Sequence, residues 1–506
     1  MQYIGQYQYD LVLERRRIES QMLLLRRMAQ FCAKLQLTSA FTSAILFTFF
    51  PNDQISVYIS GYTALLVSLV PLVYCFVNKM IVLIFSCLVI FNVAPIWFLY
   101  LEAVLPGYDA HDNIQPEYIV LTILYVAIFQ FSFNAYYALL WKPVSRRSIR
   151  FFKFLNFLNF GTGFYTKTAL VAFILPLVAF YFYYGSGEVL WRALTAGRSG
   201  GGGTGLIMRS AVGDSSAFML PLVWIWQLVP LLSSIALIRS ARGNRFMPGL
   251  AFFFGLLVIF VFFLGGSRSA MVFVAAPVLF FFFYYNRNKG IKFWILAGFL
   301  MTFFIGVMEF QVRFRGNLLE VIADPAKAAA ARGLSSATTF DLTESHRDNN
   351  MYLFCLMVKS YPDQYDFEGF NDFFATLLNP VPRALWPNKP LMAGAKDLST
   401  QRSFILEGPL NIGTTSLTFS IVGNAYLASG LLGILIYSLI YTLFCLFFDG
   451  LLFFSLPEDP LTIGILAIGI FLAFWGYRDF FALVSFLYPL LLLIFVLKFI
   501  HFLKSR

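Results

Sequence analysis

The sequence contains little charge for its length. Only 12% of its 506 residues are charged, whereas a soluble globular protein has about 25%. The hydrophobic share is 59%, and the chain has 61 phenylalanines. This composition excludes an ordinary soluble domain and indicates an integral membrane protein.

Cysteine is also scarce, and its positions form no recognisable pattern. The 5 cysteines include no CxxC pair and no cluster with histidine, so we expect neither a disulfide framework nor a zinc site. The first 34 residues lack the apolar core of a signal peptide. Insertion into the membrane must then depend on the first span itself.

The chain instead contains many long apolar runs. A helix needs about 20 mostly apolar residues to cross a bilayer, and continuous rather than alternating runs indicate helices rather than a barrel. We therefore expect an all-α polytopic transmembrane bundle of about twelve spans. The expected spans are 35–50, 55–77, 80–101, 118–141, 168–184, 217–238, 247–265, 270–285, 293–308, 425–448, 461–476 and 480–500.

Basic residues predict the orientation of the bundle. An even number of spans puts both termini on one side, and the positive-inside rule makes that side cytoplasmic. The clearest signal is the connection 142–167, which has no acid and carries Lys142, Arg146, Arg147, Arg150, Lys153 and Lys167. The connection 449–460 has only acids, among them Asp449 and Asp459, and opposes this orientation locally.

These spans divide the chain into four parts. Residues 1–34 form a basic amphipathic cytoplasmic segment, which either lies on the anionic leaflet or only anchors the topology. Residues 35–308 hold spans 1–9, and residues 425–506 hold spans 10–12 and a cytoplasmic tail. Residues 309–424 form one large external loop domain, and a loop of this length is usually functional.

Charged side chains are rare within the spans, which disfavours a charge-coupled transporter. Two arginines, Arg268 and Arg478, instead lie in short external turns between spans. Arginine stays charged and makes bidentate contacts with phosphate oxygens, so the pair favours an anionic ligand such as a lipid diphosphate. Either arginine alone is as readily explained as an interface anchor.

The large loop adds further candidates. His346 is flanked by Glu344 and Asp348, which suits a proton acceptor near neutral pH or, equally, a hydrogen-bonded surface residue. The stretch 379–390, NPVPRALWPNKP, has four prolines that exclude a regular helix and display Trp386 between cations. An indole face there suits a sugar stacked near a phosphate, although Trp386 could also be a membrane anchor.

The stretch 379–390 resembles the PR-x-x-WP-x-KP motif of bacterial O-antigen polymerases, the Wzy-type oligosaccharide repeat unit polymerases. The segments GGSRSA (265–270), SIVGNAYLASGLLG (420–433) and YRD (477–479) agree with that family. The resemblance covers roughly residues 250–485. The chain departs from the family at Gly423-Asn424, where such proteins often have a Gly-Glu pair, so an acidic role at that position is in doubt.

The resemblance implies a GT-C-like membrane glycosyltransferase that polymerises undecaprenyl-diphosphate-linked oligosaccharides at the outer face of the bacterial cytoplasmic (inner) membrane. No cofactor or metal is expected, since arginines can stabilise the leaving diphosphate and no DxD motif is present. Nucleic acid is not expected as a partner, whereas a flippase and a chain-length regulator are. The expected catalytic residues are Arg268, Arg383, Arg478 and His346, and the expected substrate-binding residues are Arg313, Arg315, Arg347, Trp386, Lys389, Tyr365 and Tyr426.

Three other functions stay open at this point. An O-antigen ligase shares the donor and the topology but transfers the glycan to a lipid A core. A flippase or exporter of lipid-linked glycan is expected to place charges in a central cavity between spans. A non-catalytic partner of an assembly complex is also compatible with the sequence, which leaves the repeat-unit sugars and the linkage unspecified.

Overall fold

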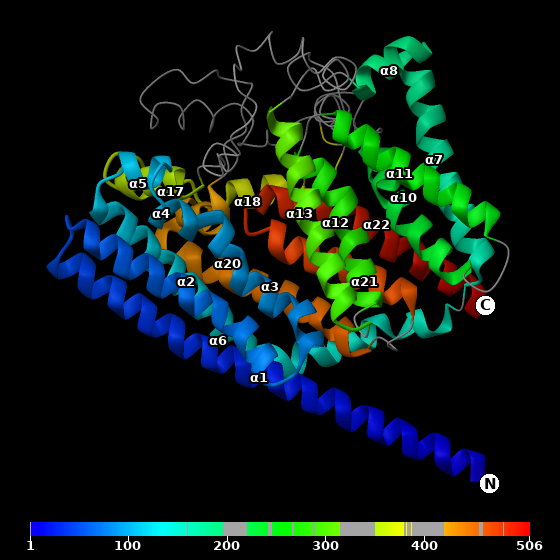
Figure 1. Cartoon of the computed structure of the whole chain (residues 1–506), viewed down its shortest axis with the longest axis horizontal. Helices are drawn as coiled ribbons and strands as arrows, with labels where there is room; N and C mark the ends of the chain where they lie inside the picture. The colour runs from blue at the N-terminus through cyan, green and yellow to red at the C-terminus, as the bar shows by residue number, and fades with distance from the viewer. Residues whose placement is uncertain are drawn as a thin grey trace.

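The computed structural model shows a bundle of long helices (Figure 1). It describes residues 2–158, 160–195, 220–240, 245–265, 268–286, 289–313, 350–378, 381, 386, 419–454, 459–478 and 480–506. Throughout these ranges the regular structure is helical, with no strand. The predicted all-α class is therefore confirmed for the part of the chain that the structure describes.

The helices follow one another with mostly short connections. In chain order they are α1 (Gln2–Phe49), α2 (Gln54–Val77), η1 (Ile81–Phe85), α3 (Cys87–Pro95), η2 (Ile96–Tyr100), α4 (Leu101–Val104), α5 (Asp109–Asn113), α6 (Pro116–Phe152), η3 (Lys153–Phe157), α7 (Thr162–Tyr184), α8 (Gly187–Thr195), α10 (Leu220–Arg239), α11 (Phe246–Leu264), α12 (Arg268–Tyr285), α13 (Ile291–Arg313), α17 (Asn350–Ser360), α18 (Asn371–Leu377), α20 (Ser420–Phe454), α21 (Pro460–Trp475) and α22 (Phe480–Ser505).

Eight helices in the described ranges are long and apolar enough to cross a membrane. They are Gln54–Val77, Cys87–Val104, Pro116–Leu155, Thr162–Tyr184, Pro221–Arg239, Phe246–Leu264, Ser420–Leu452 and Leu487–Ser505. Three shorter apolar helices are Ala270–Tyr285, Ile295–Met308 and Pro460–Trp475. The membrane character follows from these helices, whereas the twelve-span topology stays a prediction.

Both chain ends lie on the right-hand side of the bundle in Figure 1, and α5 and α17 lie on the opposite side. We call the first side the terminal end. At this end His501 and Lys504 of α22 lie against Phe154 and Phe160, which follow α6. The opposite side is called the α17 end.

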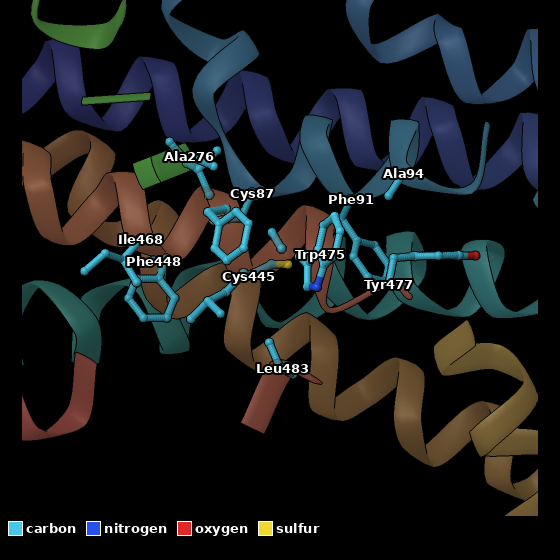
Figure 2. Close-up of a cluster of buried hydrophobic side chains, with 14 of the residues drawn as sticks. Cys87, Phe91, Ala94, Ala276, Cys445, Phe448, Ile468, Trp475, Tyr477 and Leu483 are labelled. Atoms are coloured by element: carbon cyan, nitrogen blue, oxygen red, sulfur yellow. The ribbon is translucent and has the colours of Figure 1, made fainter. Parts of the chain in front are cut away.

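The short helix α21 forms the centre of the bundle. Nearly all of its 16 residues are buried, and it packs against α3, α10, α12, α20 and α22. At 1.5 Å per residue it spans only about 24 Å, so it ends inside the bundle. Figure 2 shows the core around it, where Phe91 of α3 lies beside Trp475 and Tyr477 at the end of α21.

Helices α12 and α21 run in opposite directions. The ring of Tyr284, near the end of α12, lies 5.4 Å from that of Phe85, which directly precedes α3 at the terminal end. Helix α21 begins at the same end, where Asp459 accepts a hydrogen bond from Thr462 N at 3.0 Å and pairs with Arg239 at 2.9 Å. The start of α12 therefore lies toward the α17 end.

The N-terminal segment 1–34 is not a separate element, because α1 continues unbroken from Gln2 to Phe49. Its residues Met22, Leu25 and Met28 are buried, and α1 packs along α6. Part of the predicted leaflet-binding segment is thus integrated into the bundle. The helix continues into the first expected span, so no break in the backbone separates the two at residue 34.

Asp449 lies within α20 rather than in a cytoplasmic connection. Its side chain is buried and accepts hydrogen bonds from the backbone N–H groups of Cys87 at 2.6 Å and Leu88 at 3.1 Å, and from the Tyr137 hydroxyl at 2.7 Å. Asp449 thereby caps the N-terminus of α3 from another helix. Because Asp449 is a cap and Asp459 is paired, neither acid presents an unpaired charge at the terminal end.

Helix α20 begins at residue 420, before the expected start of the tenth span at 425, and it is broken in the middle. Ser429 has extended φ (−168°), and Gly430 has φ +58°. A positive φ is favourable for glycine because it has no Cβ. We call residues 420–428 the first arm and residues 431–454 the second arm of α20.

The two arms fold back on each other. Ile421 N of the first arm donates to Tyr477 O at 2.9 Å, and the Tyr441 hydroxyl of the second arm donates to Gly476 O. A straight helix would separate positions 421 and 441 by about 30 Å, so both reach the same turn only because α20 bends. The first arm is a half-helix that folds back on the second, and in membrane proteins such broken helices occur where the backbone is buried in protein or lines a cavity.

Replacing Gly433 with alanine tests this close packing. A Cβ at Gly433 would overlap Ala425 O of the first arm, so the arms must separate, at a cost of about 1–3 kcal/mol of unfolding free energy. The matched control is Gly298→Ala, because a Cβ at Gly298 meets nothing within 4 Å. Thermal unfolding in detergent should fall for the first variant only; equal melting temperatures would contradict the described arrangement.

Candidate functional site

The turn that follows α21 lies deep among aromatic side chains. Tyr477 is fully buried, with ring centroids 5.1 Å from Phe91 and 6.3 Å from Phe129. Phe129 lies 13 residues after the start of α6, or roughly 20 Å along that helix. The turn is therefore inside the bundle rather than at its surface.

Arg478 is held in this turn and is partly exposed. Its guanidinium carbon lies 5.4 Å from the centroid of the Trp475 ring, within the range of a cation–π contact. The backbone N–H of Arg478 donates to Trp475 O at 3.0 Å. These contacts place a permanent positive charge beside a buried indole.

The first arm of α20 begins at this same turn. Ser420 is buried and has φ +64°, and its Oγ accepts a hydrogen bond from Gly423 N at 3.2 Å. A helix N-terminus carries a partial positive charge. The start of the first arm therefore adds to the positive potential near Arg478, and the sequence from Ser420 to Gly430 contains no acid.

Arg268 begins α12 close to the level of Arg478. The ring centroids of Phe273 and Phe471 are 5.7 Å apart. Arg268 precedes Phe273 by about 7.5 Å of helix, and Arg478 follows Phe471 by about 10 Å. Because the helices are antiparallel, both displacements point toward the α17 end. The backbones of the two predicted arginines thus come to similar depth on neighbouring helices.

An aromatic segment, residues 361–370, docks onto the break in α20. Glu368 N donates to Leu427 O at 3.1 Å, which satisfies a carbonyl that the break leaves without a helical partner. The Tyr426 hydroxyl donates to Tyr361 O at 2.8 Å. A Cβ on Gly430 would lie 2.9 Å from Phe367 Cζ, so glycine gives Phe367 room to pack there.

Two of the predicted substrate-binding residues lie at this docked segment. Tyr365 is partly exposed, with its ring centroid 5.6 Å from that of Tyr361. Tyr426 is buried, at 4% exposure, and its hydroxyl is engaged with the segment. The Tyr426 hydroxyl thus contacts the docked segment, whereas Tyr365 is partly exposed.

A buried carboxylate holds α17 against the bundle. Glu102 of α4 is 1% exposed and accepts a hydrogen bond from Met351 N, in the first turn of α17, at 2.7 Å. This acid stabilises the positive end of α17. In the same helix, burial raises the pKa of the Cys355 thiol to about 12, so Cys355 stays protonated and is not a nucleophile at neutral pH.

The remaining predicted site residues are only partly placed. Arg313 ends α13 and Arg268 begins α12, with both side chains outside the described part. Trp386 is described and is 38% exposed. Five predicted residues lie outside the described residues: Arg315, His346, Arg347, Arg383 and Lys389. Their roles stay predictions.

His111, in the connection that includes α5, forms a polar cluster that was not among the predicted site residues. His111 Nδ1 lies 2.7 Å from an Asp112 carboxylate oxygen, and its Nε2 lies 2.9 Å from the Tyr58 hydroxyl and 3.1 Å from Gln54 Nε2. The adjacent His-Asp pair was visible in the sequence, whereas its contact with α2 was not. Both ring nitrogens are engaged, so the cluster fastens this connection to α2.

No group of three or more His, Cys, Asp or Glu side chains is arranged to hold a metal ion within the described ranges. Binding of an anionic group by arginine depends on other contacts. Arg478 and the start of the first arm of α20 lie at one buried turn, and the start of α12 lies at a similar depth. Such an arrangement favours a phosphate or diphosphate group.

Comparison with known proteins gives one match. The sequence profile of a family described as "Domain of unknown function (DUF8712)" matches residues 228–505, which is more than half of the chain. The matched region includes Arg268, both arms of α20 and the turn with Arg478. No curated protein and no solved structure matches the chain.

Proposed function

Because this chain belongs to the DUF8712 family, whose description gives no function, we propose its activity from its own residues. We propose that it is a membrane glycosyltransferase that polymerises undecaprenyl-diphosphate-linked oligosaccharide repeat units into O-antigen or a related surface polysaccharide. The reaction takes place at the outer face of the bacterial cytoplasmic membrane. The α17 end is then external, and the basic terminal end, with both chain termini, is cytoplasmic.

One observation carries the proposal: Arg478 lies at a buried turn where the first arm of α20 begins, and Arg268 begins α12 at a similar depth. Two helix N-termini and two arginine positions at one level favour a group with several negative charges. A lipid diphosphate has those charges, and its isoprenoid tail suits the surrounding apolar helices.

The chemistry of glycosyl transfer matches this arrangement. A hydroxyl of the newly arrived repeat unit attacks the anomeric carbon of the growing glycan, and a glycosidic C–O bond forms. The bond from that carbon to the diphosphate oxygen breaks, and its electron pair leaves with the polyprenyl diphosphate. Arginine guanidinium groups stabilise the charge that builds on this leaving group. The energy is stored in the donor, so no nucleotide is needed outside the membrane.

The aromatic segment 361–370 supplies a surface for the sugars. Tyr365 has exposed ring area beside the first arm of α20, and sugar rings stack on aromatic faces. Arg383, Trp386 and Lys389 of the proline-framed stretch extend this surface in the proposal. The acceptor proton passes to His346 or to a neighbouring acid of the same loop.

A reconstitution experiment tests the proposed function. Purified protein in lipid nanodiscs receives short-chain lipid-diphosphate repeat units, and the products are separated by size. A ladder of polymers that persists in the presence of a chelator is the expected result. Products that form only when a lipid A core is added would identify a ligase instead, and an absence of any glycosidic product would overturn the proposed enzyme.

A flippase is the second candidate, and the depth of the Arg478 turn favours it. A translocator places charge within the bundle, and Arg478 follows a tyrosine that is fully buried among α3 and α6. Sealed vesicles that contain the protein and fluorescent lipid-linked repeat units separate the two functions. Transport of the lipid without polymer formation would establish the flippase and reject the polymerase.

A further inference from the structure

Helix α6 is longer than a helix needs to be to cross a membrane, and its C-terminal part is the excess length. The apolar helix Pro116–Leu155 has 40 residues and is about 60 Å long, twice the hydrocarbon thickness of about 30 Å. Pro143 lies inside this helix, at a position where a proline removes a helical hydrogen bond. The residues after Pro143 therefore form an extension of α6 at the terminal end.

One face of this extension packs against the bundle. Ser145, Ser148 and Phe152 are buried, and the Phe152 and Phe447 ring centroids are 4.9 Å apart. These positions recur every three or four residues, as on one side of a helix. Helix α1 lies against the start of this extension, where the Arg26 guanidinium carbon is 5.8 Å from the centroid of the Trp141 ring. The side opposite the buried face points away from α20.

That opposite side carries the cations. Lys142, Arg146, Arg150 and Lys153 recur at intervals of three and four residues, and all four are exposed. The exposed Arg147 lies beside this stripe. Helical spacing thus gathers five basic residues on the solvent side of one short segment.

Helix α22 contributes further positive charge next to this stripe. The ammonium group of Lys498 lies 3.5 Å from the centroid of the Phe151 ring and 5.6 Å from that of Phe154. Lys504 lies 4.5 Å from the centroid of Phe160. These cation–π contacts hold two α22 lysines beside the end of α6.

Acids do not neutralise this surface within the sequence from 142 to 167, which contains none. Two described acids of the terminal end are engaged elsewhere, since Asp449 caps α3 and Asp459 pairs with Arg239. We call Lys142, Arg146, Arg147, Arg150, Lys153 and Lys498 the basic face. Like charges at this spacing repel one another, so a polyanionic partner stabilises the face.

Exposed apolar side chains next to these cations identify the kind of partner. Leu139 is 72% exposed and Phe151 is 36% exposed on α6, and Phe499 is 53% exposed on α22. Cations interleaved with large apolar groups are typical of a helix at a lipid surface, where the apolar groups enter the acyl boundary. An acidic protein or a nucleic acid would leave these apolar groups in water.

We propose that the basic face binds the phosphate groups of anionic phospholipid headgroups in the leaflet at the terminal end. The apolar neighbours Leu139, Phe151 and Phe499 contact the adjoining acyl chains. This site adjoins the predicted leaflet-binding segment 1–34, since the Arg26 guanidinium carbon lies 5.8 Å from the centroid of the Trp141 ring, and it is separate from the turn with Arg478. It does not depend on the proposed glycosyltransferase activity.

The test measures lipid-dependent stabilisation of the purified protein in a non-ionic detergent. Dioleoyl phosphatidylglycerol is titrated, and the concentration that gives half of the maximal rise in melting temperature is determined. The variant R146Q/R150Q should need about 25-fold more lipid, since each basic residue near an anionic surface contributes about fivefold in affinity. Phosphatidylcholine should give no comparable rise.

The matched control removes a charge at the opposite, α17 end. Lys359 is exposed in α17, and K359Q should stay within about twofold of the unmodified protein, whereas R146Q alone should need about fivefold more lipid. Raising the salt concentration should weaken the effect of phosphatidylglycerol on the unmodified protein. Equal loss in R146Q and K359Q, or equal stabilisation by inorganic phosphate or by an acidic peptide, would overturn the proposal.

Discussion

Replacing Arg478 with alanine should lower the rate of polymer formation by on the order of a hundredfold or more, because one preorganised donor to the leaving diphosphate is lost. The Arg478 guanidinium lies against the buried Trp475 ring, where a charge acts in a medium of lower dielectric than water. The effect should therefore exceed that of any exposed arginine. It is measured as the initial rate of ladder formation with short-chain lipid-diphosphate substrates.

Two further variants make this prediction specific. Arg478→Lys keeps the charge but loses the planar bidentate geometry, so its rate should fall between those of the alanine variant and the unmodified protein. Arg27→Ala removes an exposed arginine of α1 and should leave the rate unchanged. A normal rate in a correctly folded Arg478→Ala protein would remove the leaving-group role from this residue.

Replacing Asp449 with alanine should lower the unfolding free energy by on the order of 3–5 kcal/mol. The substitution leaves two buried N–H groups at the start of α3 and the Tyr137 hydroxyl without their acceptor, and each unsatisfied buried group costs about 1–3 kcal/mol. Chemical or thermal unfolding in detergent measures this loss. Asp449→Asn retains a carbonyl acceptor and should lose less.

Asp53 provides the matched control for this cap. Its carboxylate accepts a hydrogen bond from Ile55 N at 2.9 Å at the exposed start of α2, so Asp53→Ala should cost only about 1 kcal/mol. Both residues are aspartates that cap a helix, and they differ mainly in burial. Similar losses for Asp449→Ala and Asp53→Ala would show that the inter-helix cap contributes no more than a surface cap.

Hydropathy was sufficient to predict the class of fold. The low charge content and the continuous apolar runs indicate helices in a membrane, because lipid offers the backbone no hydrogen-bond partners. The described helices agree, with eight that are long and apolar enough to span. Hydropathy gave the start of α20 only to within a few residues, because the first arm is short and contains polar residues such as Ser420 and Asn424.

The candidate site was predictable only as a set of residues. Arg268 and Arg478 stood out in the sequence because they lie in turns between apolar runs. Their similar depth follows from the antiparallel packing of α12 on α21, which depends on contacts between positions such as Phe273 and Phe471. No local pattern indicates such a pairing of distant helices.

Buried acids mark the clearest limit of local reasoning. In the sequence, Asp449 and Glu102 each lie near the end of an apolar run, where an acid is usually solvated. In the structure each accepts backbone hydrogen bonds at the N-terminus of a distant helix, Asp449 at α3 and Glu102 at α17. Their partners are 362 and 249 positions away, so only the folded chain assigns these roles.

The sequence alone determined that this chain is a helical membrane protein with basic connections and arginine-bearing turns, because hydropathy and charge are properties of short segments. Only the tertiary structure decided that α21 is the central helix, that α20 is broken at Gly430, and that the Arg478 turn is buried. These features depend on long-range packing, in which a glycine or an aspartate has a role only through the helix it meets. That dependence is physical, since the hydropathy of a short segment does not specify which distant helix it contacts.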